Sequence, residues 1–499
     1  MATIKRLAGD TVWYGLSSIV GRAINILLLP VITNTISLAQ FGNYSLLYSF
    51  VAIAFIMYTL RMETAYFRFE QNKEDQSKSF SQSLVIVTIT SLLFSTLLFI
   101  FSNSLCRIID LENEYSTYVK MLAMVLFFDA VNEIPFANLR LENRPRKFAV
   151  IKLLMIGVNV GTICFFFLIC PFFIQQGYLF FHKLYQPELN LFYLFGANVL
   201  SSLIAFLLLL PQWKKFQFQL DKDLISRMVK YSLPLTIVGL AGIINETMDR
   251  VFLKKLLPYD AVKIDELLGI YSGNYKIAMF IALFTQAFRY AAEPFFFKQD
   301  REKDSNILYG KITTYYTAFS AFGFLAIGLG LPWLQDFFLR DPGYKSGYWV
   351  TPVILGANLL LGIYYNLSIW YKLRDKTSFG MGISITGAII TILGNLIFIR
   401  YYGYMASAWT TLFCYAVMTF LSYIIGRRYY PFRIEFGKIT VILIITLGSY
   451  LMYEITWHDN SVDSGLLSIV MRIIFFAVPF ILFVLWDKKE LLNIFKGKL

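Results

Sequence analysis

The chain has 499 residues, of which 57% are hydrophobic and 15% charged, with a mean hydropathy of +0.59 and a net charge of +13. A soluble globular protein is about a quarter charged, so this composition excludes that class. The basic residues lie in short loops between apolar segments and build no continuous groove, which excludes a nucleic-acid partner. With only His182 and His458, and four cysteines that lack metal spacing, no metal or other cofactor is expected.

In chain order, fourteen apolar segments are each long enough to cross a bilayer as a helix. They cover residues 11–32, 43–60, 80–101, 116–138, 149–170, 190–211, 229–250, 269–291, 311–332, 349–369, 379–400, 403–425, 437–456 and 465–486. The first segment is too long for a signal-peptide core and has no small-residue cleavage pattern after it, so we expect an uncleaved anchor. The pattern predicts an all-α polytopic membrane protein with about 14 transmembrane helices.

Most of the 45 lysines and arginines fall in every second gap between these segments, beginning with Lys5 and Arg6. Short cytoplasmic loops of membrane proteins carry such an excess of basic residues. We therefore predict that both termini are cytoplasmic. No gap is long enough to present paired catalytic acids on an extramembrane domain, so the protein is not expected to be an enzyme.

Two short motifs recur six segments apart. Residues 13–16 (Trp-Tyr-Gly-Leu) correspond to residues 230–233 (Lys-Tyr-Ser-Leu), and residues 41–45 (Phe-Gly-Asn-Tyr-Ser) correspond to residues 268–272 (Leu-Gly-Ile-Tyr-Ser). Transporters are commonly built from two structural repeats, and an even separation gives both copies the same orientation. We predict a six-helix lobe at 1–215, a second six-helix lobe at 216–430, and an additional helix pair with a cytoplasmic tail at 431–499.

These lobes, their glycine-tyrosine motifs and the segment at 402–410 (Tyr-Gly-Tyr-Met-Ala-Ser-Ala-Trp-Thr) resemble the polysaccharide flippases of the multidrug/oligosaccharidyl-lipid/polysaccharide exporter superfamily. The resemblance covers essentially the whole chain. It implies a flippase, of the O-antigen or capsule type, in a bacterial inner membrane. Its substrate would be a polyprenyl-pyrophosphate-linked oligosaccharide, moved by alternating access. The partners that it implies are this lipid-linked substrate, the bilayer and other membrane proteins of polysaccharide assembly.

Two alternatives remain open. A multidrug or cation antiporter of the same superfamily is the nearer one. Against it stands Arg22, because carriers of cationic drugs in this superfamily generally place an acidic residue in the first span. The other alternative, a membrane polymerase or ligase acting on polyprenyl-linked sugars, would need a large external loop with paired acids, which the chain lacks.

Ionisable residues inside spans are costly and usually face a cavity or a partner, so they are the candidate site residues. Arg22 lies in the middle of the first span, with Asn25 one turn further along the same face. A guanidinium binds phosphate oxygens in bidentate geometry, which suits a pyrophosphate headgroup. The alternative is an arginine paired with a carboxylate for packing. Lys276 is the corresponding cation of the second lobe, or a lysine that reaches the outer surface.

The seventh predicted span contains Glu246, Asp249 and Arg250. Glu246 and Arg250 are four residues apart and could pair along one helical face, with Asp249 beside both. That pairing could be purely structural. Alternatively, Arg250 could exchange its partner between Glu246 and a substrate phosphate as the cavity opens.

In the fourth predicted span, Asp129 and Glu133 share a face, and Pro135 is expected to break the helix. Two neighbouring carboxylates in a low-dielectric site could hold a proton or a sodium ion, which makes them candidates for ion coupling, with Glu246 and Asp249 as the second choice. The alternative is structural pairing with Arg22, Lys152 or the basic loop at 140–147. Lys152 and Arg472 are expected to lie at the membrane interface.

Overall fold

Helices make up every regular element of the part of the chain that the structure describes. The computed structural model describes residues 20–71, 74–299, 305–374, 376–430, 433–457, 465–488 and 490. Twelve of the described helices are long and apolar enough to cross a membrane, and the helix at Val20–Thr35 is a shorter apolar one. Together with α6 (Ser116–Leu141), these helices coincide with the predicted spans. The all-α polytopic fold class is confirmed, while residues 11–19 of the first predicted span lie outside the described residues.

The helices separate into two compact units. One contains the described residues up to Ser272 together with Thr391–Ser407, and the other contains Gly273–Ile390 and the described residues from Ala408 onward. The predicted division at 215 and 430 stays a prediction. The long helix α12 (Ala261–Gln299) begins in the first unit and continues into the second.

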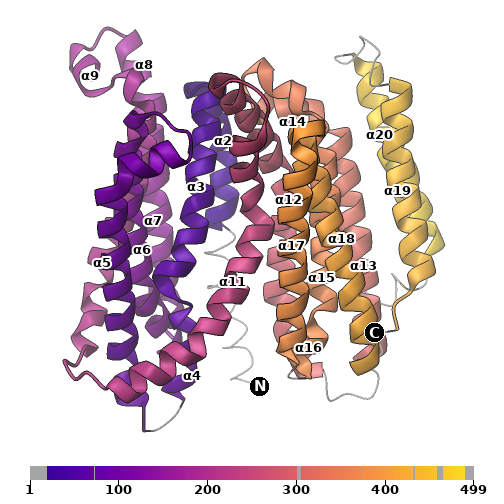
Figure 1. Ribbon diagram of the computed structural model, residues 1–499. Coiled ribbons are helices and arrows are strands. Elements are labelled where there is room, and N and C mark those ends of the chain that lie inside the picture. The colour runs from indigo at the N-terminus through magenta and orange to yellow at the C-terminus, as the bar shows by residue number, and fades with distance from the viewer. Residues whose placement is uncertain are drawn as a thin grey trace. The chain divides into compact units, whose positions relative to one another are not determined.

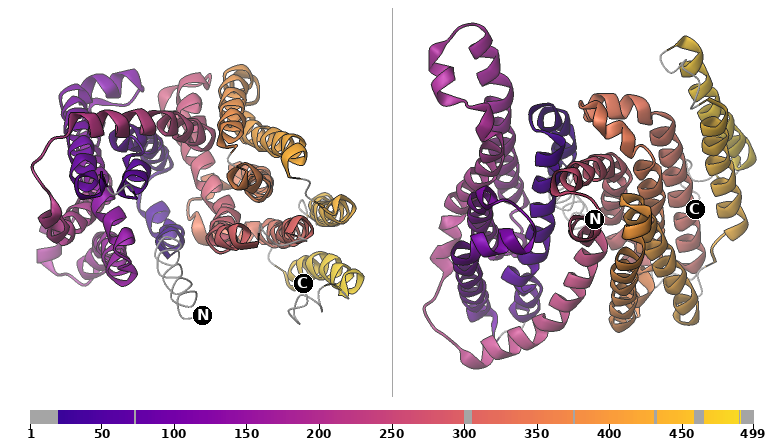
Figure 2. Two further views of the ribbon diagram at one scale, coloured as in Figure 1. Left: turned by 90° about the horizontal axis from the view of Figure 1, so that it is seen from below. Right: turned by 45° about the horizontal axis from the view of Figure 1, so that its top comes forward.

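In the first unit, α5 packs against α6, and α10 packs against both α6 and α7 (Figures 1 and 2). Besides α6 and the start of α12, the helices of this unit are α2 (Leu29–Thr35), α3 (Leu38–Thr59), α4 (Met62–Glu70), α5 (Gln76–Ile108), α7 (Pro145–Cys164), α8 (Cys170–Gln175), α9 (Leu179–Leu184), α10 (Asn190–Leu209) and α11 (Lys222–Leu256). A π-helical turn at Phe165–Ile169 joins α7 to α8.

In the second unit, α13 packs against α15 and α19, and α19 and α20 lie side by side (Figures 1 and 2). The helices that follow α12 are α13 (Ser305–Leu329), α14 (Leu331–Phe338), α15 (Val350–Leu367), α16 (Ile369–Leu373), α17 (Thr377–Tyr402), α18 (Tyr404–Tyr429), α19 (Phe436–Trp457) and α20 (Leu466–Trp486). They belong to the second unit, except for the end of α17 and the start of α18 at Thr391–Ser407. The pair α19–α20 lies in the segment 431–499, whose role as a helix pair additional to two lobes stays a prediction.

The second predicted span is longer than expected, because the chain continues as α4 after a break. Leu60 and Arg61 both adopt the left-handed conformation, with φ of 47° and 51°. For residues with a side chain this conformation costs about 1–3 kcal/mol each. The hydroxyl of Thr90 donates a 2.6 Å hydrogen bond to the Tyr58 carbonyl oxygen beside the break. Arg61 therefore lies inside a 33-residue span rather than at the start of a loop.

Pro135 does not break its helix, contrary to expectation. α6 continues past Pro135 to Leu141. A proline in a helix interior removes one backbone donor, but transmembrane helices tolerate it because neighbouring groups satisfy the freed carbonyl. Asp129 and Glu133 consequently lie within one uninterrupted helix.

The loops that the charge pattern assigns to the cytoplasm gather at one end of the first unit. Lys78 pairs with Asp221 at 3.0 Å and Arg227 with Asp75 at 2.8 Å, so the segments before α5 and α11 are tied together. Asp221 also caps α11 by accepting the Leu224 amide hydrogen. The Leu224 amide and the Lys78 ammonium lower the pKa of Asp221, so this cap weakens only as the pH falls through that lowered value.

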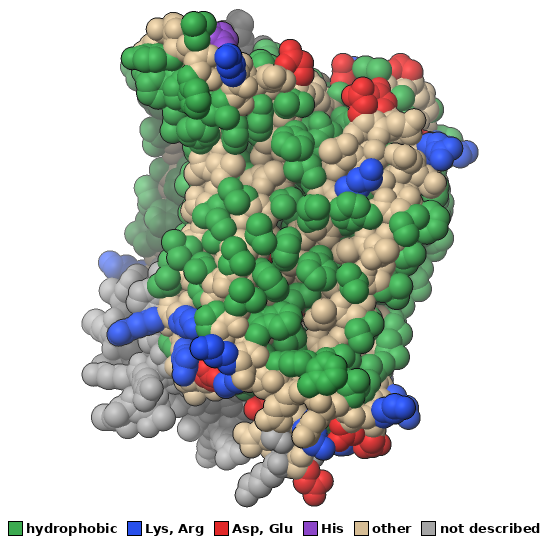
Figure 3. Space-filling view, turned by 90° about the vertical axis from the view of Figure 1, so that its left-hand side faces the viewer, with side chains coloured by type: hydrophobic (Ala, Val, Ile, Leu, Met, Phe, Trp, Pro, Cys, Tyr) green, Lys and Arg blue, Asp and Glu red, His purple; other side chains and the backbone are tan. Residues whose placement is uncertain are grey.

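The lateral surface of the first unit has the polarity of a membrane protein. Figure 3 shows one face on which hydrophobic side chains cover the middle, while Lys, Arg, Asp and Glu gather toward the two ends. Ile89, Leu92 and Ile100 of α5 are among many exposed apolar residues. An apolar surface of this extent would be unfavourable in contact with water. They are the side chains that contact lipid in a spanning helix.

Candidate transport sites

The helix at Val20–Thr35 presents Arg22 and Asn25 on an exposed face, while Ile26 and Leu28 are buried. The adjacent Gly21 packs closely against α7. A Cβ on Gly21 would lie 3.0 Å from Cδ1 of Ile156. The structure thus places both predicted cavity residues on the accessible side of the helix, where the guanidinium of Arg22 can contact a soluble or membrane-borne anion. Their role in substrate binding stays a prediction.

Arg61 is a second cation of this unit that sequence reasoning missed. Its side chain is exposed and extends along α11, where a Cβ on Gly239 would lie only 2.7 Å from its Nε. The absence of a side chain at Gly239 is what makes room for the guanidinium. The sequence did contain a signal for this position, since residues 61–70 include no glycine or proline that would end a helix.

Asp129 and Glu133 lie half-buried on one face of α6, as predicted. Asp129 Oδ1 and Glu133 Oε2 are sealed from solvent, and neither has a hydrogen-bond partner among the described residues. Lys152 of α7 interacts electrostatically with both carboxylates, and Arg61 interacts with Glu133. The ammonium of Lys152 also lies 4.2 Å from the centre of the Phe136 ring.

Lys152 is therefore part of a polar cluster between helices, while its position at the membrane interface stays a prediction. Ser202 of α10 lies beside Asp129, and Thr59 of α3 lies beside Glu133. A cation held over an aromatic face and near two acids is stabilised without reaching bulk water. Depth along the helix alone could not reveal this, because the direction of the side chain decides it. Four helices converge on the cluster.

The acidic and basic residues of α11 form a different arrangement from the expected one. Arg250 pairs with its neighbour Asp249 at 3.0 Å, and Tyr271 of α12 donates a hydrogen bond to the same carboxylate. Arg250 Nη1 lies 3.4 Å from the backbone oxygen of Glu246, whose own side chain is exposed. Asp249 and Arg250 are both buried. An exchange of partners by Arg250, and ion coupling at Glu246 and Asp249, stay predictions.

The two copies of the glycine-tyrosine motif contact each other. A Cβ on Gly42 of α3 would lie 2.2 Å from the Asp265 carbonyl oxygen, and a Cβ on Gly269 of α12 would lie 2.0 Å from the Leu38 carbonyl oxygen. Asn43 donates a 2.9 Å hydrogen bond to Asp265, which also pairs with Lys254. Only glycine permits main chains to approach this closely. The two copies of the repeated motif thus contact each other within the first unit.

Lys276 lies half-buried in the part of α12 that belongs to the second unit. Its role as the counterpart of Arg22 stays a prediction. Arg472 of α20 is buried against other helices, and its position at the membrane interface stays a prediction. Its Nε donates a 2.7 Å hydrogen bond to the Tyr453 hydroxyl, and its guanidinium lies 4.4 Å from the centre of the Trp333 ring. These contacts fasten α20 to α19 and to α14.

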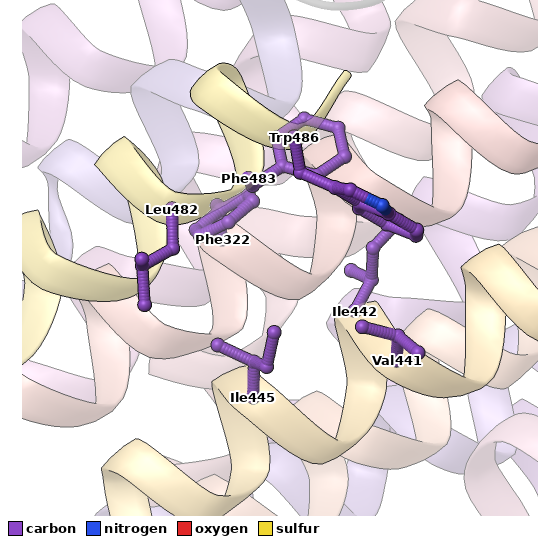
Figure 4. Close-up of a pocket in the computed structure, with 7 residues that line it drawn as sticks. All are labelled: Phe322, Val441, Ile442, Ile445, Leu482, Phe483 and Trp486. Atoms are coloured by element: carbon purple, nitrogen blue, oxygen red, sulfur yellow. The ribbon is translucent and has the colours of Figure 1, made fainter.

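α13, α19 and α20 line an apolar cavity of about 390 Å³ (Figure 4). It is lined by Phe322, Val441, Ile442, Ile445, Leu482, Phe483 and Trp486. The labelled side chains in Figure 4 surround a common space between the helices. The lining offers hydrocarbon and aromatic surface, which suits an apolar chain and not a charged headgroup.

The chain is thus a polytopic helical membrane protein with cations on accessible faces and a polar cluster inside one helix bundle. Residues 7–299 match the model of the family described as polysaccharide biosynthesis protein, and the chain belongs to that family. No curated protein sequence matches the chain significantly.

The fold is shared with solved transporters. The lipid II flippase MurJ in an inward closed conformation superposes with a TM-score of 0.72 at 11% identity, covering 96% of this chain and 100% of that one. An inward-facing multidrug resistance MATE family transporter of the MOP superfamily gives 0.64 at 13% identity, covering 88% and 98%. A MOP superfamily transporter from Pyrococcus furiosus Vc1 (DSM3638), described with a binding pocket of reverse polarity, gives 0.58 at 14%, covering 87% and 96%.

Proposed function

We propose that the protein flips a polyprenyl-pyrophosphate-linked oligosaccharide across the bacterial inner membrane by alternating access, and serves the biosynthesis of an O-antigen-type or capsular polysaccharide. Membership of the polysaccharide biosynthesis family supports the glycan, and the fold that it shares with MurJ supports a lipid-linked substrate. The proposal assigns no catalytic step to the protein, since its fold neighbours are transporters.

The observation that carries this proposal is the exposure of two arginines within apolar spans. Arg22 and Arg61 are both accessible in the first unit. A guanidinium keeps its charge at any physiological pH and binds two phosphate oxygens at once, so it fits a pyrophosphate better than a cationic drug. The apolar cavity of Figure 4 offers a separate surface that matches the hydrocarbon part of such a lipid.

Reconstitution tests the function directly. Proteoliposomes should contain a labelled polyprenyl-pyrophosphate oligosaccharide whose sugar is initially protected from an impermeant glycosidase. We expect the protein to expose this sugar to the enzyme, whereas protein-free vesicles should keep it protected. A chain that leaves the sugar protected but expels a cationic dye from the same vesicles would be an antiporter, and the flippase proposal would fail.

The orientation of the spans is a second expected outcome. Reporter domains fused after Lys78, Lys147 and Arg227 should all report the cytoplasm, because the positive-inside pattern orients every span in the same sense. Fusions after Asn113 and Glu188, in the alternate loops, should report the periplasm. A periplasmic signal from any of the first three fusions would contradict the cytoplasmic location of the termini.

A further inference from the structure

A polar pocket lies at the end of the first unit that the charge pattern assigns to the cytoplasm. Side chains of α4, α5 and α6, and of the segment around the 3₁₀-helical turn at Leu210–Lys215, line a cavity of about 440 Å³. Pockets that bind small ligands typically measure about 300–1,000 Å³, so this cavity has the size of such a site. The residues that line it belong to none of the candidate transport sites described above.

Hydrogen bonds between the elements hold the walls of this pocket in place. The Tyr66 hydroxyl of α4 donates a 3.1 Å hydrogen bond to Oδ1 of Asn138 on α6. The side-chain amide of Asn138 in turn donates at 2.8 Å to Oε1 of Gln212, in the 3₁₀-helical turn. The main-chain amide of Gln217 donates a 2.8 Å hydrogen bond to the Ser81 hydroxyl of α5. The pocket is therefore formed by the protein itself and needs no ligand to assemble it.

The lining combines amide groups with aromatic rings. Gln76, at the start of α5, and Gln217 are exposed, and each side-chain amide can both donate and accept hydrogen bonds. The buried rings of Tyr66 and Phe80 also line the pocket, with their centres 6.0 Å apart. A sugar ring has hydroxyl groups around its edge, which amides can bind, and C–H groups on its faces, which pack against aromatic surface. The lining therefore matches a carbohydrate.

The charges of the lining favour a neutral ligand. Glu70 and Lys215 both line the pocket, so its acidic and basic groups are balanced. Glu70 accepts a hydrogen bond from Ser79, and Lys215 pairs with Glu142. A phosphate would be repelled by the Glu70 carboxylate and would have to compete with Glu142 for the lysine. An apolar chain would leave the amides and charged groups without hydrogen-bond partners. A polar ligand without net charge fits best.

We propose that this pocket binds a sugar residue of the oligosaccharide on the cytoplasmic side of the membrane, before the lipid-linked substrate is flipped. The inference rests on the proposed flippase function. The pocket would recognise the glycan through Gln76 and Gln217, separately from any contact that the exposed arginines make with the pyrophosphate. A polyprenyl pyrophosphate that carries no sugar could not occupy it. Part of the specificity for the glycan is therefore built into the first unit.

Saturation-transfer difference NMR tests the pocket without any transport. The probe is the oligosaccharide released by mild acid from the polyprenyl pyrophosphate of the bacterium, which keeps the sugars and loses the lipid and phosphates. We expect the purified protein to bind it, and Gln76→Ala and Gln217→Ala each to weaken binding about 2- to 10-fold, as for the loss of one hydrogen bond. The matched control is Gln175→Ala, which removes an exposed amide from the end of α8 and should bind like the unmodified protein. Displacement of the probe by inorganic phosphate, or unchanged binding in both pocket variants, would overturn the sugar site.

The proteoliposome assay distinguishes the glycan of the substrate from a free cytosolic sugar as the ligand. A variant with both Gln76→Ala and Gln217→Ala should need a higher concentration of lipid-linked oligosaccharide for half-maximal flipping, and Gln175→Ala should not. The released oligosaccharide, added in excess, should slow flipping by the unmodified protein. If the double variant loses the soluble probe but flips with an unchanged half-maximal concentration, the pocket binds a free sugar and its role in substrate recognition is refuted. Absence of any flipping by the unmodified protein would refute the transport function, while the NMR measurement would still decide whether the pocket binds sugar.

Discussion

Replacing Arg22 with alanine should abolish flipping of the lipid-linked oligosaccharide, while Arg22→Lys should retain part of the activity. Removing a hydrogen bond to a charged group costs about 1.5–3 kcal/mol, which corresponds to a loss of about 10- to 150-fold. Lysine keeps the charge but lacks the planar fork that binds two phosphate oxygens, so its loss should be intermediate. Initial rates of sugar exposure in proteoliposomes measure both variants.

The matched control is Arg107→Ala, which removes an exposed arginine from the last turn of α5. It should flip substrate at the rate of the unmodified protein. This result would show that the loss in Arg22→Ala comes from the position of Arg22 and not from the loss of one positive charge. Arg61→Ala should behave like Arg22→Ala if both guanidinium groups contact the substrate. Normal transport by Arg22→Ala, with the protein inserted at normal levels, would remove this residue from the binding site.

Gly269→Ala should also abolish transport, although it adds a single methyl group. The new Cβ would lie 2.0 Å from the Leu38 carbonyl oxygen, and main-chain atoms cannot rotate away as a side chain can. We expect α3 and α12 to separate at this point, so that the conformation described here is no longer accessible. Gly42→Ala should have the same effect, because its Cβ would lie 2.2 Å from the Asp265 oxygen.

Gly157→Ala and Gly161→Ala on α7 serve as controls, because a Cβ at either position meets nothing within 4 Å. The separation can be measured with a cysteine placed at Ser272, which is buried one turn beyond Gly269, in a chain whose four native cysteines are replaced. Gly269→Ala should increase its reaction with an impermeant maleimide, and the α7 controls should not. Unchanged labelling together with normal transport would show that the contact can be dispensed with.

The spans were predictable from sequence because the bilayer imposes one rule on all of them. Each needs a long apolar run, and the basic loops mark the ends on one side. The boundaries were less predictable, since helices such as α5 and α11 extend beyond the apolar run at one or both ends. Hydropathy does not predict these helix ends, because helical structure outside the bilayer depends on local contacts.

The site was less predictable, because hydropathy locates a residue along a helix but not around it. Arg61 falls in a predicted loop, whereas α4 continues the helix through this region. That the Lys152 side chain faces α6 was not predicted. Asp129 and Glu133 were recognised because their spacing defines a common face. The sequence could not show that Lys152 and Arg61 reach that face from other helices.

The contact between Gly42 and Gly269 has a consequence for how the protein tolerates change. Because main-chain atoms make the approach, they cannot move aside for a larger residue as a flexible side chain could. Neither glycine has a substitute of intermediate size, since every other amino acid carries at least the Cβ that cannot fit. In a library of all single substitutions, transport activity at these two positions should not decrease gradually with the size of the side chain. Glycine should function, and every other residue should fail to the same extent.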